Sequence, residues 1–133
     1  MNSNLKIIVA FILLSLTSVF NAKADTIDEV AAFLKSGNAK ELSRYLAPQI
    51  ELTILSEQEE YQKGQAEAVL KGFFGKYTPT SAKVIHKITS NANYRYAVIN
   101  LSTSSGIFRI SISLKNFSGK FLITEMRIEE DGN

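Results

Sequence analysis

Residues 107–115 read IFRISISLK, and this stretch decides the fold class. Every second residue from Phe108 to Leu114 is apolar, whereas the residues between them are arginine or serine. Strict two-residue alternation is typical of a β-strand that buries one face and leaves the other to solvent. The stretch therefore predicts a strand in a sheet with one apolar face.

The same two-residue period extends over most of residues 81–130. Short breaks rich in serine, asparagine and glycine, which favour turns, divide it into four segments. Strands joined by such short connections pair antiparallel. We therefore expect an antiparallel meander of four long strands, over residues 82–89, 94–102, 107–115 and 120–130.

Before residue 81 the apolar spacing is mostly helical. Thr26 and Glu29 have the spacing of a capping box, and Ile27, Val30, Ala31 and Leu34 follow on one helical face. Asn38 is expected to cap a second helix that ends at Pro48. Alternation over residues 50–54 predicts a strand, residues 56–60 a turn with a short returning strand near Tyr61, and residues 64–77 a third helix.

This order of elements predicts an α+β domain in which helices cover one face of the sheet. With the closing segment Gly119–Ile123, it resembles the cone-shaped domains related to nuclear transport factor two and the steroid isomerases, which have a cystatin-like fold. Residues 33–42, 69–74 and 125–129 are similar to a family of small exported bacterial domains of unknown function. The resemblance implies three N-terminal helices packed on a curved antiparallel sheet of four long strands plus a short hairpin. It implies no activity.

The first 24 residues have the pattern of a secretory signal. Lys6 precedes the apolar run Ile7–Leu14, and the segment ends in Ala22-Lys23-Ala24. A membrane anchor is the alternative, but polar residues interrupt the run well short of the roughly 20 apolar residues that a spanning helix needs. We expect cleavage between Ala24 and Asp25, which leaves one domain over residues 25–133. It would be periplasmic or extracellular and no longer attached to a membrane.

The amino-acid composition excludes several kinds of functional site and partner. The net charge of +2 comes from Lys6 and Lys23, so residues 25–133 are neutral and no nucleic-acid partner is expected. The chain has no cysteine, and His86 is its only histidine. Thiol chemistry and multi-histidine metal sites are therefore excluded. We expect no catalytic set, no metal site and no cofactor.

Three side chains are weak candidates for ligand binding. His86 is expected either as a half-buried strand residue that shares a face with Val84 and Ile88, or as a polar group at a pocket mouth. Tyr96 alternates with Tyr94 about Arg95, a pattern that strand propensity explains and that base stacking also uses. Glu125 is the third candidate.

The direction of Glu125 depends on strand register. A four-residue loop over residues 116–119 would turn Glu125 toward the helices together with Phe121 and Ile123. A one-residue bulge would instead turn Leu122, Met126 and Ile128 inward and Glu125 outward, beside Arg109 or Arg127. We favour the outward orientation, because burial of an unpaired carboxylate is costly.

The sequence therefore predicts an exported, non-enzymatic module that binds a small apolar ligand or a protein partner. The alternative is an enzyme of the proton-transfer or hydration type that uses an acid inside the cone. Residues 121–128 place apolar side chains at odd and at even positions, and therefore on both faces of the strand. Because the helices can cover only one face, we also expect a weak homodimer through the outer face of the sheet.

The signal assignment predicts a defined N-terminus. Intact-mass measurement of the exported protein should give a chain that begins at Asp25. A mass that includes Met1–Ala24 would contradict the assignment.

Overall fold

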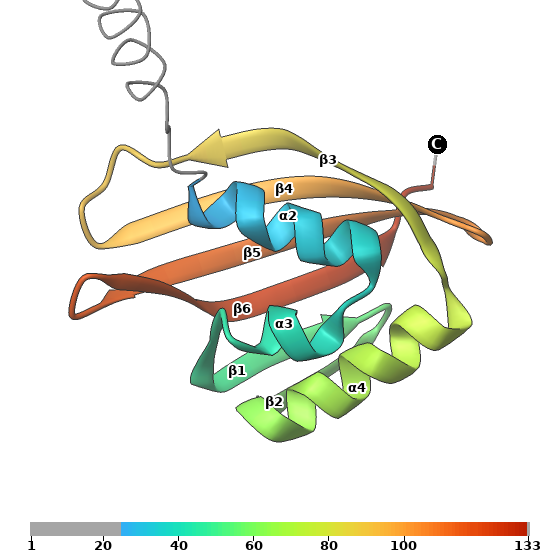
Figure 1. Ribbon diagram of the computed structural model, residues 1–133, viewed down its shortest axis with the longest axis horizontal. Helices are drawn as coiled ribbons and strands as arrows, with labels where there is room; N and C mark the ends of the chain where they lie inside the picture. Colours follow the sequence, from blue (N-terminus) through green and yellow to red (C-terminus); the bar gives the residue numbers. More distant parts are fainter. Residues whose placement is uncertain (1–24, 133) are drawn as a thin grey trace, which may run out of the picture.

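The computed structural model describes residues 25–132, so the expected signal over residues 1–24 lies outside the described residues. Three helices and six strands make up the described part of the chain (Figure 1). The helices are α2 (Thr26–Ser36), α3 (Ala39–Ser43) and α4 (Lys63–Lys76). The strands are β1 (Leu46–Ile54), β2 (Glu57–Gln62), β3 (Pro79–Ile88), β4 (Tyr94–Thr103), β5 (Gly106–Phe117) and β6 (Lys120–Glu130).

All six strands form one sheet in the order β2-β1-β6-β5-β4-β3. The β3–β6 meander is antiparallel, as its alternation predicts. The expectation of a wholly antiparallel sheet is wrong, because β1 pairs parallel with β6 and joins the hairpin to the meander. β1 also contains Pro48, which was expected to end a helix. Pro48 lies between Leu46 and Glu51, where the ladder to β6 is interrupted and no strand partner requires its missing N–H.

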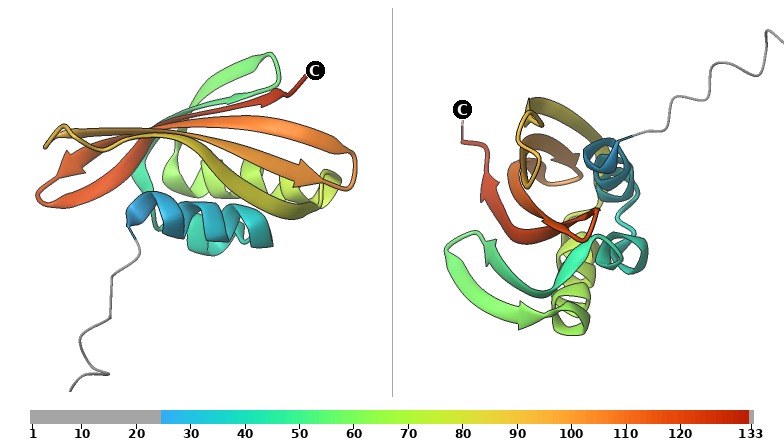
Figure 2. Two further views of the ribbon diagram at one scale, coloured as in Figure 1. Left: turned by 90° about the horizontal axis from the view of Figure 1, so that it is seen from above. Right: turned by 90° about the vertical axis from the view of Figure 1, so that its left-hand side faces the viewer.

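The helices lie together on one side of the curved sheet (Figure 2). α2 packs over β3 and β4, while α4 packs against α3 and β1. Their apolar faces meet the inward residues of the strands in one continuous core, which includes Ile27, Leu34, Leu70, Ile99 and Ile110. The fold is thus the expected α+β arrangement of one helical layer on one sheet.

The two short N-terminal helices show how local chemistry sets their ends. α2 is capped by Asp25 rather than Thr26, because the Asp25 carboxylate accepts a 3.0 Å hydrogen bond from the Asp28 N–H. Asn38 caps α3 as expected, with its side chain 3.1 Å from the Glu41 N–H. α3 ends at Ser43, earlier than expected, since the chain enters β1 at Leu46.

Two of the tight hairpins, β1–β2 and β5–β6, have shorter connections than the sequence suggested. Phe117 pairs with Lys120, so the expected four-residue loop is a two-residue turn. Ser118 and Gly119 both have positive φ, which is the type I′ geometry that matches strand twist. Ile54 likewise pairs with Glu57, so β2 begins directly after a two-residue turn instead of near Tyr61.

A one-residue bulge in β6 explains why apolar residues occupy both odd and even positions of this strand. Leu114 pairs with Ile123, but Ser113 pairs with Glu125, which leaves Thr124 as the extra residue. Ile123 before the bulge and Met126 and Ile128 after it are therefore all buried against the helices, and Phe121 packs beside them. Of the apolar residues of β6, Leu122 remains on the outer face, where it pairs with Lys115, so the apolar strip there is narrower than expected and the weak homodimer stays a prediction.

Burial of the α4 aromatic face yields the first structural test. Phe74 is only 6% exposed and belongs to the core, so Phe74→Ala should lower the free energy of unfolding by about 3–5 kcal/mol. Phe117→Ala is the matched control, because that ring is 42% exposed and its loss should cost less than about 1 kcal/mol. Chemical denaturation measures both values. Equal losses in the two variants would contradict the described packing.

Candidate functional site

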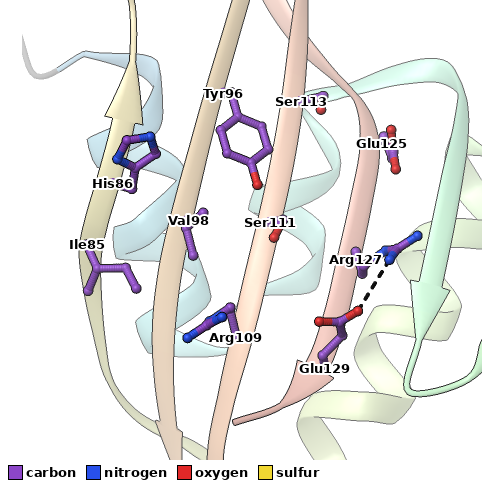
Figure 3. Close-up of a pocket in the computed structure, with 10 residues that line it drawn as sticks. All are labelled: Ile85, His86, Tyr96, Val98, Arg109, Ser111, Ser113, Glu125, Arg127 and Glu129. Atoms are coloured by element: carbon purple, nitrogen blue, oxygen red, sulfur yellow. Dashed lines mark hydrogen bonds and ion pairs between the residues drawn. The ribbon is translucent and has the colours of Figure 1, made fainter.

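The three candidate residues from the sequence meet on the outer face of the sheet, on the side away from the helices. They line one groove of about 510 Å³. Figure 3 shows His86 and Tyr96 on one side of this groove and Glu125, Arg127 and Glu129 on the other. We call it the outer groove. Its complete lining is Ile85, His86, Tyr96, Val98, Arg109, Ser111, Ser113, Glu125, Arg127 and Glu129.

Strand register explains why the groove is hollow at its centre. Tyr96 pairs with Ser113, which in turn pairs with Glu125, so these three side chains form one row across β4, β5 and β6. In the next row, Ser111 lies between Val98 and Arg127. The two serines are small residues between larger neighbours on both sides. They therefore form a low floor between raised walls.

His86 reaches the outer groove through an irregularity in β3. Val84 pairs with Ile99 but His86 pairs with Val98, so Ile85 is an extra residue in the β3–β4 ladder. His86 consequently faces outward and is exposed, whereas Val84 packs against the core. The expectations that His86 shares a face with Val84 and is half-buried are both wrong.

A salt bridge on the opposite face fixes this arrangement. The Lys87 ammonium lies 2.6 Å from the Asp25 carboxylate and 3.1 Å from that of Asp28, at the start of α2. The hydrogen bond that Lys87 donates to Asp25 raises the pKa of Lys87. Lys87 therefore stays charged and directed toward the helices, which leaves His86 on the groove side, with its ring 6.4 Å from that of Tyr96.

Glu125 faces outward, as favoured from the sequence, because the Thr124 bulge reverses the parity of β6. The expected surface pair with an arginine is not formed. Arg127 lies 3.4 Å from Glu129, and Arg109 lies 3.7 Å from Asp131. Within residues 25–132, Glu125 takes part in none of the ion pairs within 4 Å.

The outer groove has no net charge, because its two arginines are matched by Glu125 and Glu129. In the described part of the chain, no group of three or more histidine and acidic side chains is placed to hold a metal ion. No helix within residues 25–132 is long and apolar enough to cross a membrane. The groove is a polar surface of hydroxyl, aromatic and charged groups, in which Arg109, Arg127 and Glu129 form ion pairs and Glu125 does not.

A carboxylate–tyrosine pair on the helix side was missed from the sequence. The Tyr45 hydroxyl donates a 2.6 Å hydrogen bond to Glu29. This hydrogen bond, together with burial, raises the pKa of Tyr45 to about 12. Glu29 had been assigned to the cap of α2. The helical spacing of Leu42, Tyr45 and Leu46 indicated only an apolar face of the second helix and gave no sign that Tyr45 would contact α2.

A second pocket, mostly apolar, lies between α4 and the β1–β2 hairpin. We call it the helix–hairpin pocket. It holds about 290 Å³ and is lined by Leu52, Ile54, Leu55, Glu57, Tyr61, Val69, Gly72, Phe73, Lys76 and Tyr77. Val69, Gly72, Phe73 and Lys76 form one stripe along α4. A Cβ atom added at Gly72 would meet nothing within 4 Å, so this missing side chain helps to leave the pocket open.

The walls of the helix–hairpin pocket are firmly supported. Phe73 and Tyr77 stack with ring centroids 4.9 Å apart, and both contact Phe108 of β5, at 5.2 and 4.8 Å. At the rim, Leu55 has a φ of 58° and is 40% exposed. Its N–H donates to the Ile128 carbonyl at 2.8 Å, which holds this strained backbone in place.

Comparison with known proteins identifies the family. The model of the domain of unknown function DUF4783 matches residues 27–129, which is nearly the whole described region. The chain belongs to this family. A DUF4783 protein from Bacteroides uniformis has 25% sequence identity and a TM-score of 0.78, over 82% of this chain and 100% of that one.

More distant structures show the fold alone. A domain of unknown function with a cystatin-like fold from Nostoc punctiforme has a TM-score of 0.62 at 9% identity, over 83% of this chain and 81% of that one. A protein named Rd1NTF2_05 with five substitutions gives 0.60 at 12% identity, over 77% and 91%. No curated protein matches the chain. The resemblance stated from the sequence is thus confirmed for the DUF4783 family and for its fold.

The Glu29–Tyr45 hydrogen bond predicts an unusual titration. Because the pKa of Tyr45 is raised to about 12, protonated Tyr45 stabilises the folded state below about pH 10, and this contribution is lost as the pH rises toward 12. Alkaline titration of tyrosine absorbance should show a transition near 12 that Tyr45→Phe removes. Glu29→Gln should move it toward 10, whereas Glu130→Gln should not. An unchanged transition in Glu29→Gln would contradict the assignment.

Proposed function

We propose that this DUF4783 protein is an exported, non-enzymatic module that binds a small apolar ligand in the helix–hairpin pocket. The observation that carries the proposal is the gap at Gly72 inside an otherwise apolar and aromatic lining. Ligand pockets are typically apolar, with a few polar groups that fix orientation. Here Glu57 and Lys76 are the charged groups in the lining, and they suit a ligand with one polar end.

The strained turn at the rim supports the same proposal. A leucine with positive φ costs about 1–3 kcal/mol, which glycine or asparagine at this position would largely avoid. Leu55 nevertheless leaves 40% of its surface exposed and lines the pocket. An apolar ligand would cover this side chain and recover about 25 cal/mol for each Å² of apolar surface removed from water.

The size of the pocket limits the ligand. A volume of about 290 Å³ lies at the lower end of the range for small-molecule sites. A single aromatic ring system or a short acyl chain fits this space better than a large steroid-like molecule. The packed Phe73–Tyr77–Phe108 cluster further favours a compact ligand.

The alternative function, proton transfer or hydration by an acid inside the cone, has less support. Glu125 lies on the outer face, so it is not available for this role. Glu29 and Tyr45 are an acid and a hydroxyl in contact on the helix side, which is the observation that favours an enzyme. However, a tyrosine with a pKa near 12 is a weaker proton donor at neutral pH than an ordinary one.

Filling the helix–hairpin pocket from α4 tests the proposal. Gly72→Leu should weaken binding of N-phenyl-1-naphthylamine, a neutral fluorescent apolar probe, at least tenfold, because the new side chain occupies the ligand space. The free energy of unfolding should stay the same or rise by about 0.5–1 kcal/mol, since leucine favours the helix over glycine. Probe fluorescence and chemical denaturation measure the two effects.

Gly75→Leu is the matched control. It lies on the same helix, its Cβ would also meet nothing within 4 Å, and it does not line the pocket. This variant should gain similar stability and keep full probe binding. If both variants bind the probe equally well, or if the native protein binds none, the proposed function is wrong.

A further inference from the structure

We propose that the outer groove is a second, independent binding site, and that its ligand is a neutral saccharide. The groove lies on the opposite face of the sheet from the helix–hairpin pocket, and the two share no lining residue. The inference therefore does not rest on the proposed function. Three properties of the groove select the ligand class: its free hydrogen-bonding groups, its charge balance and its aromatic wall.

The first property is a set of polar groups without strong partners. Glu125 accepts from no side chain within the described residues, and the same holds for the hydroxyls of Tyr96 and Ser111. Ser113 has one long contact, 3.5 Å to the Tyr94 hydroxyl. A carboxylate accepts, whereas hydroxyls both donate and accept. Together these groups match a ligand that carries several neighbouring hydroxyl groups.

The second property disfavours a strongly charged ligand. Both arginines of the groove already lie beside acids, Arg127 at 3.4 Å from Glu129 and Arg109 at 3.7 Å from Asp131. A phosphate or carboxylate ligand would have to compete with these acids and would also face Glu125. A cationic ligand could pair with Glu125, the one acid of the groove outside the ion pairs, but it would also lie beside the guanidinium groups of Arg109 and Arg127. A neutral polar molecule satisfies the groove without either penalty.

The third property is the wall formed by β3 and β4. The rings of Tyr96 and His86 lie 6.4 Å apart at an angle of 67°, with Ile85 and Val98 beside them. An aromatic face with apolar neighbours suits the C–H face of a pyranose ring, whose hydroxyls project from the edge. Figure 3 shows this wall across the serine floor from Glu125.

The dimensions also agree with a sugar. Tyr96 and Glu125 lie on strands two positions apart, so their backbones are about 10 Å from one another, with Ser113 between them. This gap admits one ring in contact with both walls. The full groove of about 510 Å³ extends along the strands, so it has room for more than one sugar unit.

The test is a titration of the purified ¹⁵N-labelled protein, followed by heteronuclear NMR. The probes are maltose, cellobiose, lactose and N,N′-diacetylchitobiose, each compared with its monosaccharide. We expect at least one disaccharide to shift the amide signals of residues 96–98, 111–113 and 125–127 with a dissociation constant near the millimolar range, and to bind more tightly than its monosaccharide. The same spectra report whether each variant is folded.

Two variants and a matched control locate the site. Tyr96→Ala removes the ring platform and should weaken binding at least tenfold. Glu125→Gln keeps the shape, changes the acceptor, and should weaken binding about fivefold to tenfold. Phe117→Ala is the control, because Phe117 is an exposed aromatic residue on the same face of the sheet but does not line the groove. It should keep at least half of the native affinity.

Each outcome decides for or against the inference. Saturable shifts in the groove that Tyr96→Ala and Glu125→Gln reduce, and Phe117→Ala does not, support a saccharide site. Absence of shifts with all the probes at tens of millimolar overturns it. Groove signals that change only with protein concentration would show a contact between copies of the chain, which also overturns it. Sugar-induced shifts confined to the helix–hairpin pocket would do the same.

Discussion

The extra residue at Thr124 is the constraint on which both faces of the molecule depend. It lets Ile123 and Met126 point to the same side of β6, although their spacing would normally place them on opposite sides. Without this bulge, either the first or the second half of the strand would expose its apolar residues. With it, the core is continuous under the helices, and Glu125 takes its place in the outer groove.

Much of the fold could be predicted because its signals are local. Alternation such as that of residues 107–115 requires only that one face of the strand be buried, and all four long strands were found from it. The register was less accessible. A two-residue turn at Ser118–Gly119 and a four-residue loop both satisfy the same composition, and the apolar residues of β6 are compatible with a bulge but do not give its position. The parallel β1–β6 pair joins segments separated by more than 60 residues, so no local pattern indicates it.

The residues of the candidate site were predicted from the sequence, but the reason that they lie together was not. His86, Tyr96 and Glu125 were each chosen on separate grounds, and only the register of β3, β4, β5 and β6 shows that they share a groove. The serines of β5 had been read as the solvent side of a strand, which is correct, but their low height matters only beside large neighbours. Glu29–Tyr45 and the gap at Gly72 depend on how helices pack, and periodicity carries no information about that.

The two proposed sites are separate in space and joined in structure through β5. Phe108 supports the aromatic wall of the helix–hairpin pocket, and Ser111, three residues later, forms the floor of the outer groove. Because side chains alternate along a strand, a slip of one residue in β5 would exchange these roles and damage both sites. Substitutions that keep the register, such as those at Gly72 or Tyr96, should affect one site only. The bulge in β6 sets how β5 pairs with Glu125 and Met126, and the bulge in β3 brings His86 to the margin of the outer groove, so both bulges shape that groove.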